Sequence, residues 1–81
     1  MQHKYKQIND IYLVISNNIK KYRIKNHMTQ KELATKSGYS YAYIRQIESK
    51  SNKKRITIET IYNISLTLNI NITKLFEDEN I

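Results

Sequence analysis

The chain has 81 residues and a formal net charge of +7 at pH 7, with a single glycine and neither proline nor cysteine. A chain this short forms one small domain, and the lack of cysteine excludes a disulfide framework, a thiolate metal site and a cysteine nucleophile. One glycine is too few for the glycine-rich loops with which nucleotide-dependent enzymes approach phosphate. His3 and His27 lie far apart without an acidic cluster between them. We therefore expect no enzyme activity, no cofactor, no metal site and no small-molecule ligand.

The charge is distributed unevenly along the chain. Residues 1–56 carry 13 basic and three acidic side chains, a net charge of +10, whereas residues 57–81 carry one lysine and four acidic side chains, a net charge of −3. This separation favours a first portion that faces a polyanion and a second portion that faces a partner. The longest apolar run, residues 11–15, is too short for a membrane span or a signal peptide, so we expect a cytoplasmic protein.

The first predicted helix begins at Asn9 or Asp10 and ends near Asn26 and His27. Its apolar residues recur at helical spacing, with Ile11, Ile15, Ile19 and Tyr22 on one face. Asparagine and histidine tolerate the left-handed backbone conformation that often follows a helix. Residues 1–8, before this helix, are expected to form a disordered basic arm.

Two short helices follow, joined by a tight turn. Thr29 is the N-cap of the second predicted helix and forms a capping box with Glu32, and Gly38 ends that helix in the left-handed conformation. Ser40 is the N-cap of the third helix. Two short helices joined in this way are the sequence form of a helix-turn-helix.

The remaining predicted elements are also helices. The fourth runs from Thr57 to about Leu68, and the fifth runs from Ile72 to Phe76 after the N-cap Asn71. The core face assigned to the fourth helix comprises Ile58, Ile61, Tyr62, Ser65 and Leu68, with Ile64 beside it. Neither hairpin turns nor sustained alternation of apolar and polar residues occur. The predicted fold class is therefore all-α, with one domain over residues 9–76 and a short acidic tail over residues 77–81.

The third predicted helix has one apolar and one polar face. Ile44 and Ile47 face inward, and the opposite side carries Tyr41, Ala42, Arg45, Gln46 and Ser49. An α-helix fits the major groove of B-DNA, where Arg45 can donate twice to guanine, Gln46 can pair with adenine and Ala42 can contact a thymine methyl group. The alternative is that this face is only solvated, as polar helix faces usually are.

Five segments between residues 15 and 76 follow the pattern of one family. They are Met28-Thr29-Gln30-x-x-Leu33-Ala34, Ser37-Gly38-Tyr39-Ser40, Tyr43-Ile44-x-x-Ile47-Glu48, Thr57-Ile58-Glu59-Thr60-Ile61 and Leu68-x-Ile70-Asn71-Ile72-x-x-Leu75-Phe76. In their order they resemble the Cro/repressor-type helix-turn-helix family, also called XRE, over about three quarters of the chain. The resemblance implies a five-helix, lambda-repressor-like DNA-binding domain whose third helix reads operator DNA and which acts as a dimer.

The resemblance also implies roles for single residues. Gln30 matches a phosphate-binding glutamine that also braces the start of the third helix. Tyr43 matches a tyrosine that lies against the DNA backbone, particularly in controller proteins of restriction-modification systems. Arg23 and Glu48 match a structural ion pair between the first helix and the end of the third. The positions that usually read bases are occupied by Ser40, Tyr41, Ala42, Arg45 and Gln46.

Two features depart from the family pattern. The segment after the third helix is long and basic, and we expect Lys50, Lys53, Lys54 and Arg55 to contact DNA phosphates; the alternative is a solvated loop. Relatives often carry glutamine or arginine at the position of Tyr41, and tyrosine cannot make a bidentate pair with a base. The operator sequence therefore does not follow from the chain.

Apolar residues that continue into the acidic C-terminal region predict a dimer interface. They are Leu66, Ile70, Ile72, Phe76 and Ile81, some of which must instead close the core of the monomer. A twofold dimer would place two recognition helices about 34 Å apart and would read a palindromic operator.

These features together predict a transcriptional regulator that binds double-stranded DNA as a homodimer. Tyr43, the basic segment and the single-domain length favour the controller of a restriction-modification system over a phage or plasmid repressor or a small housekeeping regulator. The alternative function is an antitoxin-type protein-interaction module that also autoregulates through its helix-turn-helix. Only about five residues follow Phe76, which is too few to wrap around a toxin. RNA is a less suitable target, because a helix cannot enter the deep, narrow major groove of A-form RNA.

Overall fold

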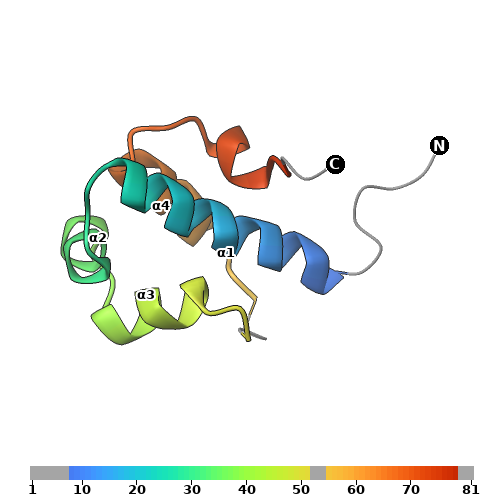
Figure 1. Cartoon of the computed structure of the whole chain (residues 1–81), viewed down its shortest axis with the longest axis horizontal. Coiled ribbons are helices and arrows are strands. Elements are labelled where there is room, and N and C mark those ends of the chain that lie inside the picture. The colour runs from blue at the N-terminus through green and yellow to red at the C-terminus, as the bar shows by residue number, and fades with distance from the viewer. Residues whose placement is uncertain (1–7, 52–54, 79–81) are drawn as a thin grey trace.

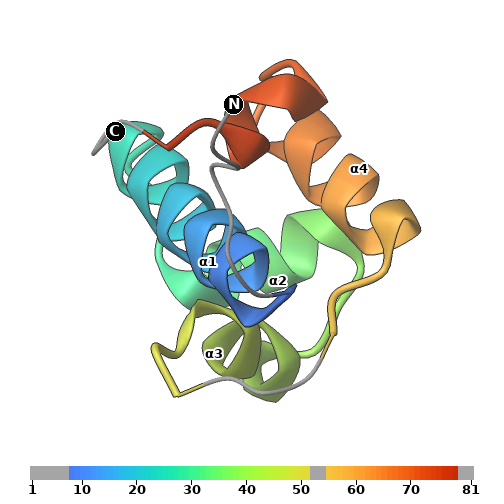
Figure 2. The same cartoon turned by 90° about the vertical axis from the view of Figure 1, so that its right-hand side faces the viewer.

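The computed structural model of the chain describes residues 8–51 and 55–78. Its elements are α1 (Ile8–Lys25), α2 (Gln30–Ser37), α3 (Tyr41–Glu48), α4 (Ile58–Thr67) and the short 3₁₀-helix η1 (Ile72–Phe76). Helix α1 runs through the middle of the molecule, with α3 on one side and η1 on the opposite side (Figure 1 and Figure 2). The predicted all-α class is confirmed, and the fifth predicted helix is a 3₁₀-helix of five residues.

Polar side chains cap the helices at the predicted positions. The hydroxyl oxygens of Thr29, Ser40 and Thr57 each accept a hydrogen bond from the backbone N–H three residues later, at 3.0, 3.1 and 3.2 Å. Glu32 completes the capping box by accepting from the backbone N–H of Thr29 at 3.0 Å. These bonds satisfy donors that the first turn of a helix leaves without intrahelical partners.

The start of α1 differs from the prediction. The helix begins at Ile8, so this residue belongs to the helix and not to the arm expected over residues 1–8, whose other residues lie outside the described part of the chain. Asp10 lies in the first turn, where a carboxylate interacts favourably with the helix dipole. The sequence prediction placed the start of this helix one or two residues later, at Asn9 or Asp10.

Three residues with positive φ follow the helices. His27 after α1 has φ 57°, Gly38 after α2 has φ 84° and Asn69 after α4 has φ 56°. The first two agree with the predicted helix ends, and Asn69 was not predicted. These left-handed residues let the chain reverse within one or two residues, which keeps the helices close together.

One hydrophobic core joins all the elements. Among the described residues, the fully buried apolar side chains come from every helix and comprise Ile15, Ile19, Leu33, Ile44, Ile47, Ile64, Leu68 and Leu75. The amide of Asn18 fastens η1 to α1, because its Nδ2 donates to the carbonyl oxygens of Leu75 at 2.9 Å and Glu77 at 2.7 Å. No helix in the described residues is long and apolar enough to cross a membrane.

The buried face of α4 agrees only in part with the predicted one, since Ile61, Ile64, Ser65 and Leu68 are buried as expected. Ile58 is 65% exposed and Tyr62 is 52% exposed, so the prediction that both face the core is wrong. The buried residues of this helix are Thr60, Ile61, Ile64 and Ser65. Apolar residues occur on two sides of α4, so helical spacing alone did not identify the side that packs.

Candidate nucleic-acid interface

Helix α3 separates a buried apolar face from an exposed polar one. Ile44 and Ile47 are fully buried in the core. On the other side, Ser40, Tyr41, Ala42 and Arg45 are exposed and Gln46 is half-buried. The five residues predicted to contact bases therefore lie at or near the surface of one short helix, which occupies the edge of the molecule opposite η1 (Figure 2).

The turn between α2 and α3 sets the angle between the two helices. The backbone N–H groups of Gly38 and Tyr39 both donate to the carbonyl oxygen of Ala34, at 2.9 and 3.0 Å. Ala34 and Leu33 are buried, and they hold α2 against the core behind α3. This arrangement leaves the polar face of α3 outside, which is the geometry of a helix-turn-helix.

A buried charge cluster fixes the end of α3 to α1. The guanidinium of Arg23 donates to both carboxylate oxygens of Glu48, through Nε at 2.7 Å and Nη2 at 2.9 Å, and its Nη1 donates to the carbonyl oxygen of Met28 at 2.8 Å. Two parallel bonds of this kind define both distance and direction. The pair thus fixes how α3 lies against α1.

Gln30 belongs to the same cluster. Its Nε2 donates to Oε1 of Glu48 at 3.1 Å. Glu48 is the last residue of α3, so the expectation that Gln30 braces the start of this helix is wrong. A carboxylate is a stronger acceptor than a neutral group, which explains the choice of partner. The expected contact of Gln30 with a DNA phosphate stays a prediction.

Two tyrosines connect the turn to the rest of the domain. The hydroxyl of Tyr39 donates to Oγ1 of Thr60 at 3.2 Å and accepts from Nδ2 of Asn63 at 3.1 Å. The ring of Tyr43 lies 5.3 Å from the ring of Tyr39, at a tilt of 43°. Within the described part of the chain, the hydroxyl of Tyr43 has no hydrogen-bond partner, so it is available to a ligand.

The basic segment after α3 is only partly described. Lys50 and Arg55 are exposed, and Lys53 and Lys54 lie outside the described residues. Ser49 and Ser51 share a hydrogen bond of 2.9 Å where the segment leaves α3. Lys50 therefore lies exposed directly beyond the end of α3.

Sequence reasoning missed one set of contacts on this face. The ring of Tyr41 lies below two cations, with Nζ of Lys31 at 5.4 Å and Cζ of Arg45 at 5.5 Å from the ring centre. The spacing of Tyr41 and Arg45, four residues apart on one helix, is a signal that could have revealed half of this arrangement. The contribution of Lys31 from α2 depends on the tertiary structure.

A second surface, on α4, is apolar. Ile58, Tyr62 and Leu66 are 65%, 52% and 58% exposed and recur every four residues, so they form a stripe that we call the α4 stripe. Of the other residues predicted for a dimer interface, Ile70, Ile72 and Phe76 are half-buried against the core. Ile81 lies outside the described residues.

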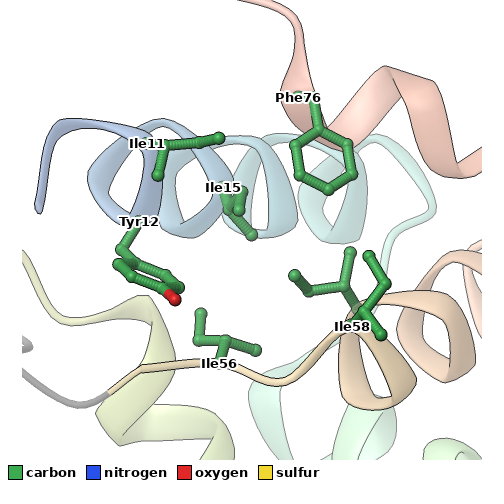
Figure 3. Close-up of a pocket in the computed structure, with 7 residues that line it drawn as sticks. Ile11, Tyr12, Ile15, Ile56, Ile58 and Phe76 are labelled. Carbon is green, nitrogen blue, oxygen red and sulfur yellow. The ribbon is translucent and has the colours of Figure 1, made fainter. Parts of the chain in front are cut away.

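An apolar cavity opens beside the α4 stripe. Its volume is about 210 Å³, and Figure 3 shows its walls coming from α1, from the segment before α4, from the start of α4 and from η1. The lining residues are Ile11, Tyr12, Ile15, Ile56, Ile58, Ile61 and Phe76. The hydroxyl of Tyr12 is the one polar side-chain group among them, so the cavity has no set of groups for catalysis.

The fold and the exposed polar face of α3 are those of a helix-turn-helix DNA-binding domain. The helix-turn-helix family matches residues 19–75, which is more than half of the chain. The chain belongs to this family, in its Cro/repressor-type (XRE) branch, and the members of this branch are DNA-binding transcription regulators.

Several proteins similar to this chain are controllers or transcription regulators. The chain is 32% identical to the control protein C.SmaI of Serratia marcescens over 66 residues, which cover 82% of this chain and 76% of that protein. It resembles the restriction-modification controller protein C.Esp1396I with a TM-score of 0.72 and 33% identity, over 82% of this chain and 83% of the other. It also resembles SinR, the master regulator for biofilm formation, solved in complex with DNA, with a TM-score of 0.71 and 27% identity over 78% and 98% of the two chains.

Proposed function

We propose that this protein is a cytoplasmic regulator that reads a palindromic operator as a homodimer and controls a restriction-modification system. The observation that carries the proposal is the exposed polar face of α3 over a fully buried apolar face. On this face Arg45 donates to a guanine, and Gln46 pairs with adenine. Ser40, Tyr41 and Ala42 complete the set of base-contacting residues.

Phosphate contacts surround these base contacts in the proposal. Gln30, Tyr43, Lys50, Lys53, Lys54 and Arg55 supply them, and the unpartnered hydroxyl of Tyr43 and the exposed heads of Lys50 and Arg55 support this assignment. Contacts to phosphate position a protein on the duplex and supply most of the salt-dependent affinity, whereas base contacts supply the sequence preference.

The α4 stripe supports the homodimer. Three large apolar side chains that recur along one helix and are more than half exposed are unusual on a small monomer, and their burial against a second copy would remove them from water. Leu66 was expected at this interface from the sequence, and Ile58 and Tyr62 extend it along α4. The controller relatives C.SmaI and C.Esp1396I support the restriction-modification role.

DNA recognition is tested by selecting sequences from random duplexes with the purified protein and measuring affinities by fluorescence anisotropy. We expect one palindromic sequence to be enriched. Arg45→Ala should remove the preference at one base pair per half-site, at a cost of about 1–3 kcal/mol. Lys50→Ala should weaken all sequences alike and reduce the salt slope by about 0.9 per half-site. A specificity that is unchanged in Arg45→Ala would show that α3 does not read this base pair.

The homodimer is tested by sedimentation equilibrium over a range of protein concentrations. We expect Leu66→Lys to raise the dimer dissociation constant at least about tenfold, because a charge would be buried at the contact. Leu13→Lys is the matched control, since Leu13 is also an exposed apolar residue but lies on α1. A wild-type protein that stays monomeric would contradict the proposal, and a stoichiometric protein partner in place of a second copy would support an antitoxin.

A further inference from the structure

The contact between Lys31, Tyr41 and Arg45 connects the two helices of the helix-turn-helix. Lys31 lies near the start of α2, Tyr41 is the first residue of α3, and Arg45 lies one turn further along α3. Both cations lie within 5.5 Å of the centre of the same ring, which is 41% exposed. The ring attracts each cation through the negative charge of its face.

Neither Lys31 nor Arg45 has a carboxylate partner among the residues that the structure describes. The acidic residue of the recognition helix itself, Glu48, is paired with Arg23. Two positive charges at one exposed ring repel each other, and an approaching anion or hydrogen-bond acceptor offsets this repulsion. The surface of a DNA groove offers both, as phosphate oxygens and as acceptor atoms of bases.

We propose that Tyr41 is a positioning residue, which holds the guanidinium of Arg45 in the orientation that meets a base, and that Lys31 is a further phosphate contact. The inference rests on the proposed reading of DNA by α3. A free arginine side chain occupies many rotamers, and binding must select one of them at an entropic cost. An arginine already held against a ring loses less freedom on binding, so its discrimination between bases is sharper.

The role of Tyr41 is tested on the operator that the wild-type protein selects, at the base pair whose preference is lost in Arg45→Ala. Tyr41→Phe keeps the ring, and we expect it to keep the preference at this base pair within twofold. Tyr41→Leu removes the ring, and we expect a loss of preference of about fivefold at the Arg45 base pair, with the melting temperature unchanged. In the Arg45→Ala background, Tyr41→Leu should have no further effect at this base pair.

The role of Lys31 is tested by the salt dependence of the same binding. Lys31→Ala should reduce the slope of log affinity against log salt by about 0.9 per half-site without changing base preferences. The control is Lys36→Ala, because Lys36 is also exposed on α2 but lies at the other end of the helix. We expect this variant to keep the wild-type slope.

The outcomes separate this inference from the function on which it rests. A wild-type protein that enriches no sequence would overturn the proposed function and this inference with it. If the wild type enriches an operator and Tyr41→Leu keeps the preference at the Arg45 base pair, only the positioning role is overturned. A folded Tyr41→Leu protein that loses affinity equally for all sequences would also overturn it, since Tyr41 would then act on the backbone. Equal slopes for Lys31→Ala and the wild type would overturn the phosphate contact.

Discussion

At the scale of single residues, the buried charges carry a structural role. The Arg23 and Glu48 side chains are 10% and 2% exposed, so their ionic groups have left water almost completely. Desolvation of this kind costs several kcal/mol for each ion, and it is offset only if the hydrogen bonds are complete. Glu48 receives three such bonds from Arg23 and Gln30. The cluster is therefore sensitive to the loss of one member.

We expect Arg23→Met to lower the free energy of unfolding by about 3 kcal/mol, because it leaves the carboxylate of Glu48 buried without its cation. The double variant Arg23→Met/Glu48→Leu should recover most of this loss, since it removes both charges. Urea denaturation followed by circular dichroism measures the difference. A double variant no more stable than the single one would show that the ion pair is not the cause.

The capping box gives a prediction for pH. The backbone N–H and the hydroxyl of Thr29 hydrogen bond to Glu32 and hold the pKa of its carboxyl below the ordinary value of 4.5. A pKa that is lower in the folded state means that the ionised carboxylate stabilises the fold above the ordinary pKa, and that this stabilisation is lost as the pH falls through the lowered pKa.

We expect an NMR titration of the Glu32 carboxyl to give a pKa below that of the same group in Thr29→Ala, where the hydroxyl is missing. The backbone bond remains in this variant, so its pKa should move only part of the way back to the ordinary value. Equal pKa values in the two proteins would contradict the hydroxyl's part in the shift.

At the scale of elements, α2 and α3 depend on the turn that joins them. Each has eight residues, and helices of this length are not stable alone in water. Their caps, their buried faces and the left-handed Gly38 together keep them in place. A Cβ atom at position 38 would meet no atom within 4 Å, so the demand for glycine there comes from the backbone conformation and not from crowding.

We therefore expect Gly38→Ala to lower the free energy of unfolding by about 1 kcal/mol, which is the cost of the left-handed conformation for a residue with a Cβ atom. Gly38→Asn should cost less, because asparagine adopts this conformation more readily. Chemical denaturation measures both. A loss in Gly38→Ala of several kcal/mol would indicate crowding, which the open space around this position does not predict.

At the scale of the whole molecule, the hydroxyl of Tyr39 links the helix-turn-helix to α4. It donates to Thr60 and accepts from Asn63, so the turn is tied to the helix that carries the α4 stripe. In a dimer built on this stripe, the orientation of α4 would set the direction of both recognition helices. The same domain thus joins the DNA-facing surface to the surface proposed to pair with a second copy.

The two neighbouring tyrosines, Tyr39 and Tyr43, should respond differently to loss of the hydroxyl. We expect Tyr39→Phe to lower the free energy of unfolding by about 1 kcal/mol, because two hydrogen bonds to α4 are lost. Tyr43→Phe should leave stability unchanged and weaken binding to all DNA sequences by about fivefold, because the lost bond goes to a phosphate. Thermal melting and anisotropy measure the two effects. If both variants changed the melting temperature and the DNA affinity by the same amounts, the structural role of Tyr39 and the DNA-binding role of Tyr43 would be contradicted.

Local features were predicted well, and burial was predicted less well. The N-caps at Thr29, Ser40 and Thr57 follow from side chains that act within four residues of themselves, so the sequence contains the whole interaction. The core face of α4 does not follow in this way. Apolar spacing predicted one face and wrongly included Ile58 and Tyr62 in it. The burial of Thr60, which bonds to Tyr39, depends on a contact 21 residues away in the chain.

The all-α class, the boundaries of the short helices and the polar face of α3 follow from the amino-acid sequence, because caps, turns and helical spacing are local properties. Three further features follow from the packed structure alone: Gln30 pairs with the end of α3, Ile58 and Tyr62 face outward, and Lys31 and Arg45 share the ring of Tyr41. Each of these depends on the distance between side chains of different helices or on which side of a helix is covered. Both the distances between helices and the covered side of each helix are set by packing between segments far apart in the chain, so they cannot be predicted from any short stretch of sequence.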